Sequence, residues 1–290
     1  MILSFHPIFE GDHNRLCAGR DPNADDLAAI ARAAVVILPQ GCRASLYRAA
    51  KHYGARVFPN YDARFRYPGK IGQSRLFEKT GVPHPRTVRY KDTAAFFSRH
   101  PEGGSPIRLP AVVKLDWGGE SAGVFPVARE QELASIIHRL RACETIDRSG
   151  FIIQQWIPAG ARSLRVVVMG HQMVSYWRKV PPGKMDLASL THGGTIDRSS
   201  DRHLIAAAES AAADFCAQTD INLAGFDFLF STDAAVADPG TPLFLEINYF
   251  FGRRGLGGSD AYYRRLVKAI DHWMRNGDAD PPSSKGKPRL

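Results

Sequence analysis

The stretch Leu243-Phe244-Leu245-Glu246-Ile247-Asn248 places two oxygen-bearing side chains on an otherwise apolar strand. Residues two apart on a strand project to the same face, so Glu246 and Asn248 are predicted to point together. Upstream, Gly225-Phe226-Asp227-Phe228-Leu229-Phe230 supplies a third oxygen ligand in Asp227 if its strand is adjacent. Such a set is the one that Mg²⁺ prefers. The alternative is a set of polar strand positions that face solvent in an antiparallel sheet.

A second polar feature is Lys114, which ends a predicted apolar strand and opens the segment Leu115-Asp116-Trp117-Gly118-Gly119-Glu120-Ser121-Ala122-Gly123-Val124. A lysine held on a strand beside a glycine-rich loop suits a polyphosphate, because the ammonium neutralises charge while the loop N–H groups approach closely. The loop is not a Walker loop, since GxxxxGK[ST] is absent. Taken alone, it is also compatible with a flexible hairpin tip that carries an exposed lysine.

Two arginines, Arg165 and Arg178, stand inside predicted strands of the same part of the chain. A guanidinium on a sheet can brace a phosphate or a carboxylate through its planar fork. Taken singly, each is more often a surface arginine.

The remaining pattern divides the chain into three regions. The first alternates predicted strands and helices, which favours a parallel sheet, with strands at 2–5, 33–38 and 55–58 and helices at 25–34 and 41–53. The second has predicted strands at 86–90 and 111–114 and helices at 74–80, 94–99 and 129–142. The third is predicted to be one large sheet with strands at 151–157, 164–169, 173–178, 225–230 and 243–248, helices at 201–218 and 262–274, and a loop at 181–195.

Composition limits the function classes without choosing among them. The 290 residues are 44% hydrophobic and carry a net charge of +9, which excludes a collagen-like, coiled-coil or wholly disordered chain. The positive surplus suits nucleic acid, an anionic membrane surface or a small anionic ligand. Four scattered cysteines, no basic leader and no apolar run near the roughly 20 residues of a membrane span predict a cytoplasmic protein without a membrane partner.

The order of these polar residues resembles that of ATP-grasp ligases, and most closely the glutathione synthetase and ribosomal-protein glutamate ligase branch. The resemblance covers about residues 55–270 and implies an α/β (α+β) ATP-grasp fold, in which two α+β subdomains clamp ATP. The implied domains are an N-terminal α/β domain at 1–68, a small or lid subdomain at 69–150, a catalytic subdomain at 151–275, and a disordered tail at 276–290.

The resemblance also implies a role for each polar position. Catalytic contacts with the transferring phosphoryl and the acyl phosphate fall to Arg165, Arg178 and Lys114. Mg²⁺, as two ions that Mn²⁺ could replace, is held by Asp227, Glu246 and Asn248. The residues implied to contact ATP, through the phosphates, the covering loop or the adenine-reading hinge, are Lys70, Lys114, Gly118, Gly119, Ser121, Gly123, Gln154, Gln155, Trp156 and Ile157.

Several positions depart from the family pattern. The departures are Gln155 for a hinge Glu, Ser163 for an Asp before the arginine, Ser189 for an Asn, and Ser121 for a loop glycine. In the family, a turn of small residues usually follows the strand that carries the Glu and Asn metal ligands, here Glu246 and Asn248. In this chain the turn is replaced by Tyr249-Phe250-Phe251-Gly252-Arg253-Arg254-Gly255. The lysines and the metal trio remain, so the departures concern the acceptor. Arg253 and Arg254 are predicted to bind a carboxylate-bearing substrate, and the alternative is a solvated basic turn.

The function implied is an ATP-dependent carboxylate–amine ligase. It acts through an acylphosphate on small-molecule or peptide-like carboxylates and amines. Either Asp227→Asn or Glu246→Gln is expected to abolish Mg²⁺-dependent turnover and to spare the fold. The alternatives are a kinase or another synthetase on the same fold, or a non-catalytic nucleotide-binding or nucleic-acid-binding protein. Nucleic acid is disfavoured, because no basic helix interleaved with aromatic residues is present. A homo-oligomer is left open.

Overall fold

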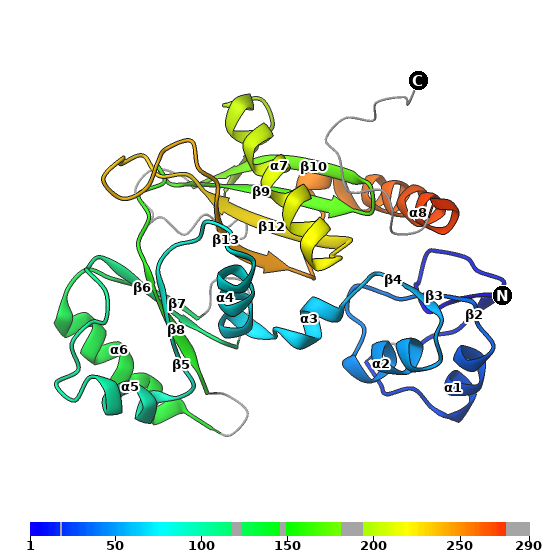
Figure 1. Cartoon of the computed structure of the whole chain (residues 1–290), viewed down its shortest axis with the longest axis horizontal. Helices are drawn as coiled ribbons and strands as arrows, with labels where there is room; N and C mark the ends of the chain where they lie inside the picture. The colour runs from blue at the N-terminus through cyan, green and yellow to red at the C-terminus, as the bar shows by residue number, and fades with distance from the viewer. Residues whose placement is uncertain (18, 118–122, 146–148, 181–193, 277–290) are drawn as a thin grey trace.

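The computed structural model describes residues 1–17, 19–117, 123–145, 149–180 and 194–276. Its strands form three sheets that follow one another along the chain (Figure 1). Parallel and antiparallel pairing are both present, so the predicted mixed α/β class is confirmed. None of the described helices combines the length and the apolar character that crossing a bilayer requires.

The first sheet is parallel, as the alternation of strands and helices predicts. Its strand order is β2-β1-β3-β4, from β1 (Ile2–Ser4), β2 (His13–Asn14), β3 (Val35–Ile37) and β4 (Arg56–Phe58). Helices α1 (Ala24–Ala31) and α2 (Ala44–His52) connect these strands. Asn23 begins α1, where its side chain accepts a hydrogen bond from the amide of Asp26. The two-residue strand β2 is not predicted by the sequence pattern, which is too short there to show alternation.

The second sheet is antiparallel and has the order β5-β8-β6-β7. Its members are β5 (Thr87–Tyr90), β6 (Ala111–Leu115), β7 (Val124–Val127) and β8 (Phe151–Gln155), and α5 (Thr93–Arg99) and α6 (Glu130–Cys143) pack against it (Figure 1). The expectation that 151–157 belongs to the large third sheet is therefore wrong. An apolar strand pattern reports burial but not the pairing partner, and β8 pairs with β5 and β6.

The third sheet is also antiparallel and has the order β11-β10-β9-β12-β13. Its strands are β9 (Arg162–Met169), β10 (Gln172–Lys179), β11 (Thr195–Asp197), β12 (Leu223–Leu229) and β13 (Leu243–Asn248). Alternate side chains of β9 enter two different apolar clusters, one under α7 (Arg202–Thr219) and one under α8 (Gly258–Asn276). The helices thus cover opposite faces. Thr195, predicted in a loop, begins β11.

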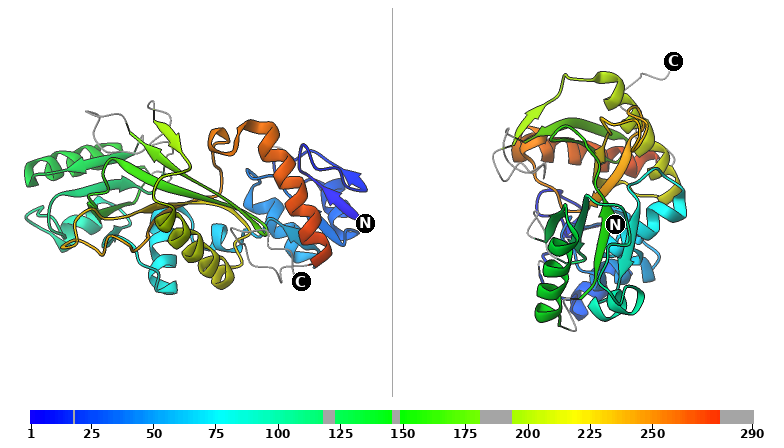
Figure 2. Two further views of the ribbon diagram at one scale, coloured as in Figure 1. Left: turned by 90° about the horizontal axis from the view of Figure 1, so that it is seen from above. Right: turned by 90° about the vertical axis from the view of Figure 1, so that its left-hand side faces the viewer.

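Helices also occupy the two junctions between sheets. The short α3 (Asp62–Arg66) leads into α4 (Gly69–Thr80), which lies between the second and third sheets (Figure 1). α4 starts five residues before its predicted start, and the side chain of Asp116 accepts a hydrogen bond from the amide of Ile71 in its first turn at 2.7 Å. At the other junction, α8 lies beside the first sheet (Figure 2), where Arg56 donates to the carbonyl of Trp273 at 3.0 Å.

Candidate active site

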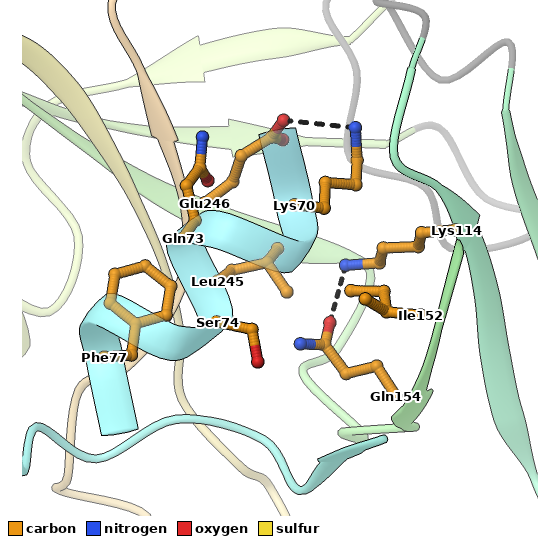
Figure 3. Close-up of a pocket in the computed structure, with 9 residues that line it drawn as sticks. All are labelled: Lys70, Gln73, Ser74, Phe77, Lys114, Ile152, Gln154, Leu245 and Glu246. Carbon is orange, nitrogen blue, oxygen red and sulfur yellow. Dashed lines mark hydrogen bonds and ion pairs between the residues drawn. The ribbon is translucent and has the colours of Figure 1, made fainter. Parts of the chain in front are cut away.

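A cleft opens between α4, β6, β8 and β13, where the second and third sheets meet (Figure 3). The empty space in the cleft, including the part that is open to solvent, is about 280 Å³. The side chains that line it are Lys70, Gln73, Ser74, Phe77, Lys114, Ile152, Gln154, Leu245 and Glu246. Both predicted phosphate-binding lysines, one hinge glutamine and one predicted metal ligand are therefore brought together.

Lys114 is a buried cation whose near neighbour is neutral. Its side chain comes from β6, is 9% exposed, and donates to Oε1 of Gln154 at 2.6 Å. Gln154 in turn donates to the hydroxyl of Thr87 at 2.9 Å. Burial lowers the pKa of the Lys114 ammonium to about 8, and Lys70 acts in the same direction, against the opposing effect of Glu246 and Asp227. A buried charge without a close counter-charge favours an anionic ligand.

Lys70 reaches the same cleft from the first turn of α4. Its Nζ lies 3.6 Å from Oε1 of Glu246, the contact drawn as a dashed line in Figure 3. The Glu246 side chain is 35% exposed, so this pair is only partly desolvated. A metal-bound anion could therefore replace Glu246 as the partner of Lys70 at a modest cost in free energy.

Asp227 lies on β12, is 3% exposed, and is surrounded by donors. Arg165 binds it through two parallel hydrogen bonds of 2.6 Å each, and Arg178 approaches Oδ2 at 2.9 Å. The amide nitrogen of Asn248 donates to the same oxygen at 3.1 Å. Burial by itself would raise the pKa of the Asp227 carboxyl, but the two guanidinium groups outweigh it and hold that pKa below its usual value.

The strand register explains this cluster. Asp227 is paired with Arg165 on β9 and with Glu246 on β13, so the predicted adjacency of the Asp227 and Glu246 strands is confirmed. A carboxylate offers about four acceptor positions. In Asp227, three of the four donor contacts converge on Oδ2 and one reaches Oδ1, so Oδ1 keeps an acceptor position. Its negative charge is thus already balanced, whereas that of Glu246 is shared with one partly exposed lysine.

The donor set fits Mg²⁺ by its chemistry. Two carboxylates and an amide oxygen stand on neighbouring strands, and hard oxygen ligands of this kind hold Mg²⁺ together with phosphate oxygens and water. The described residues contain no group of three His, Cys, Asp or Glu that could hold a metal ion by themselves. The predicted trio has only two carboxylates, because its third member is Asn248.

The predicted hinge follows β8 and is partly used within the protein. The amide of Gln155 donates to the carbonyl of Arg86 at 2.8 Å, and the amide of Trp156 donates to that of Pro110 at 3.4 Å. Ile157, the next residue, is 6% exposed. The side chain of Gln154 points into the cleft (Figure 3). The sequence does not reveal this, because only the backbone of the hinge is predicted to contact the nucleotide.

Parts of the predicted loops lie outside the described residues. These are Gly118, Gly119 and Ser121 of the phosphate loop, Ser189 of the later loop, and the tail from residue 277. Gly123 is described, and a Cβ placed on it would lie 3.0 Å from the Leu115 side chain. A larger residue there would therefore require the Leu115 side chain to shift by a few tenths of an ångström.

The two predicted substrate arginines differ in their surroundings. Arg253 stacks on the ring of Tyr263, with 4.4 Å between the guanidinium carbon and the ring centre, whereas Arg254 is exposed at the start of the short helix η2 (Arg254–Leu256). Burial lowers the pKa of His6 to about 4, and Arg253 adds to this effect. The Tyr263 ring also lies 5.9 Å from the ring of His6, so Arg253 lies near the loop that follows β1.

Three further polar residues contact elements of the candidate site and are not among the predicted site residues. Ser163 accepts hydrogen bonds from Arg178 at 2.8 and 3.2 Å, so its departure from the family pattern is the one available signal. Arg198 donates to the carbonyl of Gly255 in the short helix η2 at 3.0 Å. Gln73 contacts the backbone of β13. Neither Arg198 nor Gln73 belongs to a motif.

Comparison with known families decides the family. A family model described as the RimK-like ATP-grasp domain matches residues 70–256. The chain belongs to the RimK-like ATP-grasp family. The resemblance seen in the order of the polar residues is confirmed, and so is the ATP-grasp fold. Among curated proteins, none matches the sequence.

Solved structures with the same fold include ligases of several kinds. D-alanine–D-alanine ligase from Bacillus anthracis has a TM-score of 0.60 at 15% identity, covering 90% of this chain and 86% of its own. A RimK domain ATP-grasp protein from Sphaerobacter thermophilus has a TM-score of 0.54 at 17% identity, covering 81% of this chain and 78% of its own. The ATP-grasp ligase PsnB, complexed with minimal precursor, Mg and ADP, has a TM-score of 0.55 at 16% identity, covering 93% of this chain and 98% of its own. At such identities the likeness shows the fold alone.

Family membership sets the enzyme class. The chain is an ATP-dependent carboxylate–amine ligase in general terms, and ATP-grasp ligases use ATP and Mg²⁺ on small-molecule or peptide substrates.

Proposed function

We propose that this enzyme joins a carboxylate to an amine through an acylphosphate. A substrate carboxylate oxygen attacks the γ-phosphorus of ATP, the bond to the bridging oxygen breaks, and ADP leaves. The amine nitrogen then attacks the acyl carbon, and phosphate leaves with the electron pair of the C–O bond, while the amine proton passes to phosphate or water. The observation that carries the proposal is the buried Lys114 ammonium, which faces a cleft shared with Lys70 and Glu246.

The nucleotide is proposed to lie with its phosphates between α4 and β6. Lys114 and Lys70 enter that space from opposite sides (Figure 3), so the two ammonium groups can neutralise a triphosphate. Because the amides of Gln155 and Trp156 already donate within the protein, we assign the reading of the adenine edge to the backbone of Ile157. The glycine-rich loop that follows β6 is proposed to cover the phosphates.

The metal is proposed to bind at Glu246 and Asn248, with Asp227 completing the set. When bound, Mg²⁺ would neutralise charge on the phosphate oxygens. Two ions, and replacement by Mn²⁺, remain part of the proposal. Since Asp227 accepts four hydrogen bonds, its second task is to hold the guanidinium groups of Arg165 and Arg178 side by side.

Arg165 and Arg178 are proposed to stabilise the charge that moves from ATP to the carboxylate. Arg165 is buried on the third sheet and Arg178 is mostly buried there, and Ser163 supports Arg178 from the neighbouring strand. Preorganised donors of this kind lower the barrier because they need no rearrangement as charge develops. No covalent enzyme nucleophile is needed.

The carboxylate substrate is proposed to be an amino acid or a peptide. Arg253 belongs to the segment after β13 and lies near the loop after β1, and the carboxyl end of a parallel strand is a common place for a ligand. The solved PsnB complex contains a precursor together with Mg and ADP, which supports a peptide-like substrate by analogy of fold only. Arg254, being exposed, would act at the rim.

The wider organisation is likewise proposed. We retain an N-terminal domain at 1–68 and a catalytic region up to 275, but the pairing of β8 moves the end of the small subdomain from 150 to beyond Gln155. All four cysteines are described, and none is in a disulfide, which supports a cytoplasmic location. A homo-oligomer stays a prediction.

Trapping with hydroxylamine tests the proposed chemistry without knowledge of the amine. The enzyme is incubated with ATP, Mg²⁺ and hydroxylamine, with single L-amino acids and short acidic peptides as the carboxylate. We expect one class of carboxylate to give a hydroxamate and an equal amount of ADP, and Glu246→Gln to give neither. Release of ADP with a stable phosphorylated product and no hydroxamate would instead identify a kinase.

A further inference from the structure

Gln73 makes a pair of hydrogen bonds to the backbone of the metal strand. Its Oε1 accepts from the amide of Ile247 at 2.9 Å, and its Nε2 donates to the carbonyl of the same residue at 2.8 Å. Ile247 lies between Glu246 and Asn248, the two proposed metal ligands on β13. The Gln73 side chain of α4 therefore binds both backbone polar groups of the one residue that separates these ligands.

The helix that carries Gln73 is itself attached to the second sheet. Asp116, just after β6, accepts from the amide of Ile71 at 2.7 Å. Arg89 of β5 donates to Ser74 at 3.0 Å and to Glu78 at 2.7 Å. α4 is thus held to the sheet of Lys114 through its first turn and one face, and to the metal strand through Gln73. Lys70 stands one turn before Gln73 on the same helix face.

We propose that Gln73 is a positioning residue that sets β13, and with it Glu246 and Asn248, against Lys70 and the phosphates. The inference rests on the proposed function of the cleft. Glu246 points toward Lys70 on one side, while Gln73 lies beside it and engages the adjacent backbone (Figure 3). Residues that orient metal ligands from behind change metal affinity by about 10- to 100-fold when they are replaced.

A purely structural role is a distinguishable alternative. α4 also packs on β13 through Phe77 and Phe244, whose ring centres lie 5.5 Å apart, and this apolar contact does not involve Gln73. If Gln73 only added stability, its loss would lower the melting temperature and leave the metal dependence of nucleotide binding unchanged. If it positions the ligands, the metal dependence shifts.

The experiment is calorimetric binding of the non-hydrolysable analogue AMP-PNP over a series of Mg²⁺ concentrations. We expect Gln73→Met to raise the Mg²⁺ concentration for half-maximal binding about tenfold and to leave the affinity measured in EDTA unchanged. Gln73→Glu, which keeps an acceptor for the Ile247 amide but loses the donor to its carbonyl, should shift it in the same direction. Gln131→Met, an exposed glutamine on α6, is the matched control.

The outcomes separate the two proposals. Wild-type Mg²⁺ dependence in a folded Gln73→Met variant overturns the role of Gln73 and leaves the site intact. Should Gln73→Met fail to fold, the folded Gln73→Glu variant decides by the same criterion. Absence of any Mg²⁺-dependent AMP-PNP binding in the wild type would overturn both the inference and the proposed function.

Discussion

Lys114 and the pair formed by Arg165 and Arg178 are buried cations on neighbouring sheets, but their charges are balanced in different ways. Lys114 has the neutral Gln154 as its close partner, and burial lowers its pKa to about 8. The two arginines share the buried carboxylate of Asp227. The first site therefore favours an incoming anion, whereas the second is a preformed charge cluster. We therefore propose that the nucleotide phosphates bind on the lysine side and that the arginine side supports the reacting groups.

The largest expected effect comes from removing the Asp227 carboxylate, which Arg165 and Arg178 share. Asp227→Asn leaves two guanidinium groups buried without a counter-charge, so we expect the free energy of unfolding to fall by about 3–5 kcal/mol. Urea denaturation measures it, with Asp62→Asn, an exposed aspartate, as control. The simple expectation that Asp227→Asn spares the fold is thus revised. A loss below about 0.5 kcal/mol would show that Asp227 does not balance these charges.

Glu246→Gln should separate metal binding from folding. Its side chain is partly exposed and pairs with one lysine at 3.6 Å, so we expect the free energy of unfolding to change by less than about 0.5 kcal/mol. Mg²⁺-dependent ADP release should fall by about 100-fold or more, because a metal ligand is lost. Glu132→Gln on α6, also at a side chain that is 35% exposed, should keep full activity. Full activity in Glu246→Gln would remove Glu246 from the metal site.

Lys114→Met tests the lysine side through stability. Replacing a buried, unbalanced cation by an apolar side chain of similar length should raise the free energy of unfolding at pH 7 by about 1–2 kcal/mol. Between pH 8 and 10.5 the unfolded chain keeps the Lys114 proton that the folded chain loses, so wild-type stability rises with pH and the gap narrows. Lys91→Met, at a lysine 83% exposed, is the control. A lower free energy of unfolding in Lys114→Met than in the wild type would contradict the conclusion that the Lys114 charge lacks a counter-charge.

Ser163→Ala gives the smallest expected effect. The hydroxyl accepts two hydrogen bonds from Arg178, and losing a bond of about 1 kcal/mol should lower the turnover number about fivefold with little change in KM for ATP. Ser175→Ala, which removes a hydroxyl bonded to Glu209 elsewhere on β10, should leave turnover unchanged. Equal turnover in both variants would mean that Arg178 does not need Ser163.

Much of the candidate site follows from the sequence because strand periodicity places side chains reliably. The bounds of β13 are those predicted, and the adjacency of Asp227 to Glu246 needs only neighbouring strands. The sheet of β8 does not follow, because pairing is decided by tertiary contacts. β7 contains Pro126, which is tolerated since β7 is an edge strand but weakens the strand pattern. Gln73 is invisible because a polar helix residue usually faces solvent.

The central claim, that Lys114 receives the phosphates of ATP, is tested most directly by the pH dependence of AMP-PNP binding at saturating Mg²⁺. The phosphate-binding form of Lys114 is protonated, and with a pKa of about 8 its population falls about tenfold between pH 7 and pH 9. The account predicts that the Kd of the wild type rises by about this factor and that the Kd of Lys114→Met, weaker throughout, stays level. Equal pH dependence in the two proteins would contradict it.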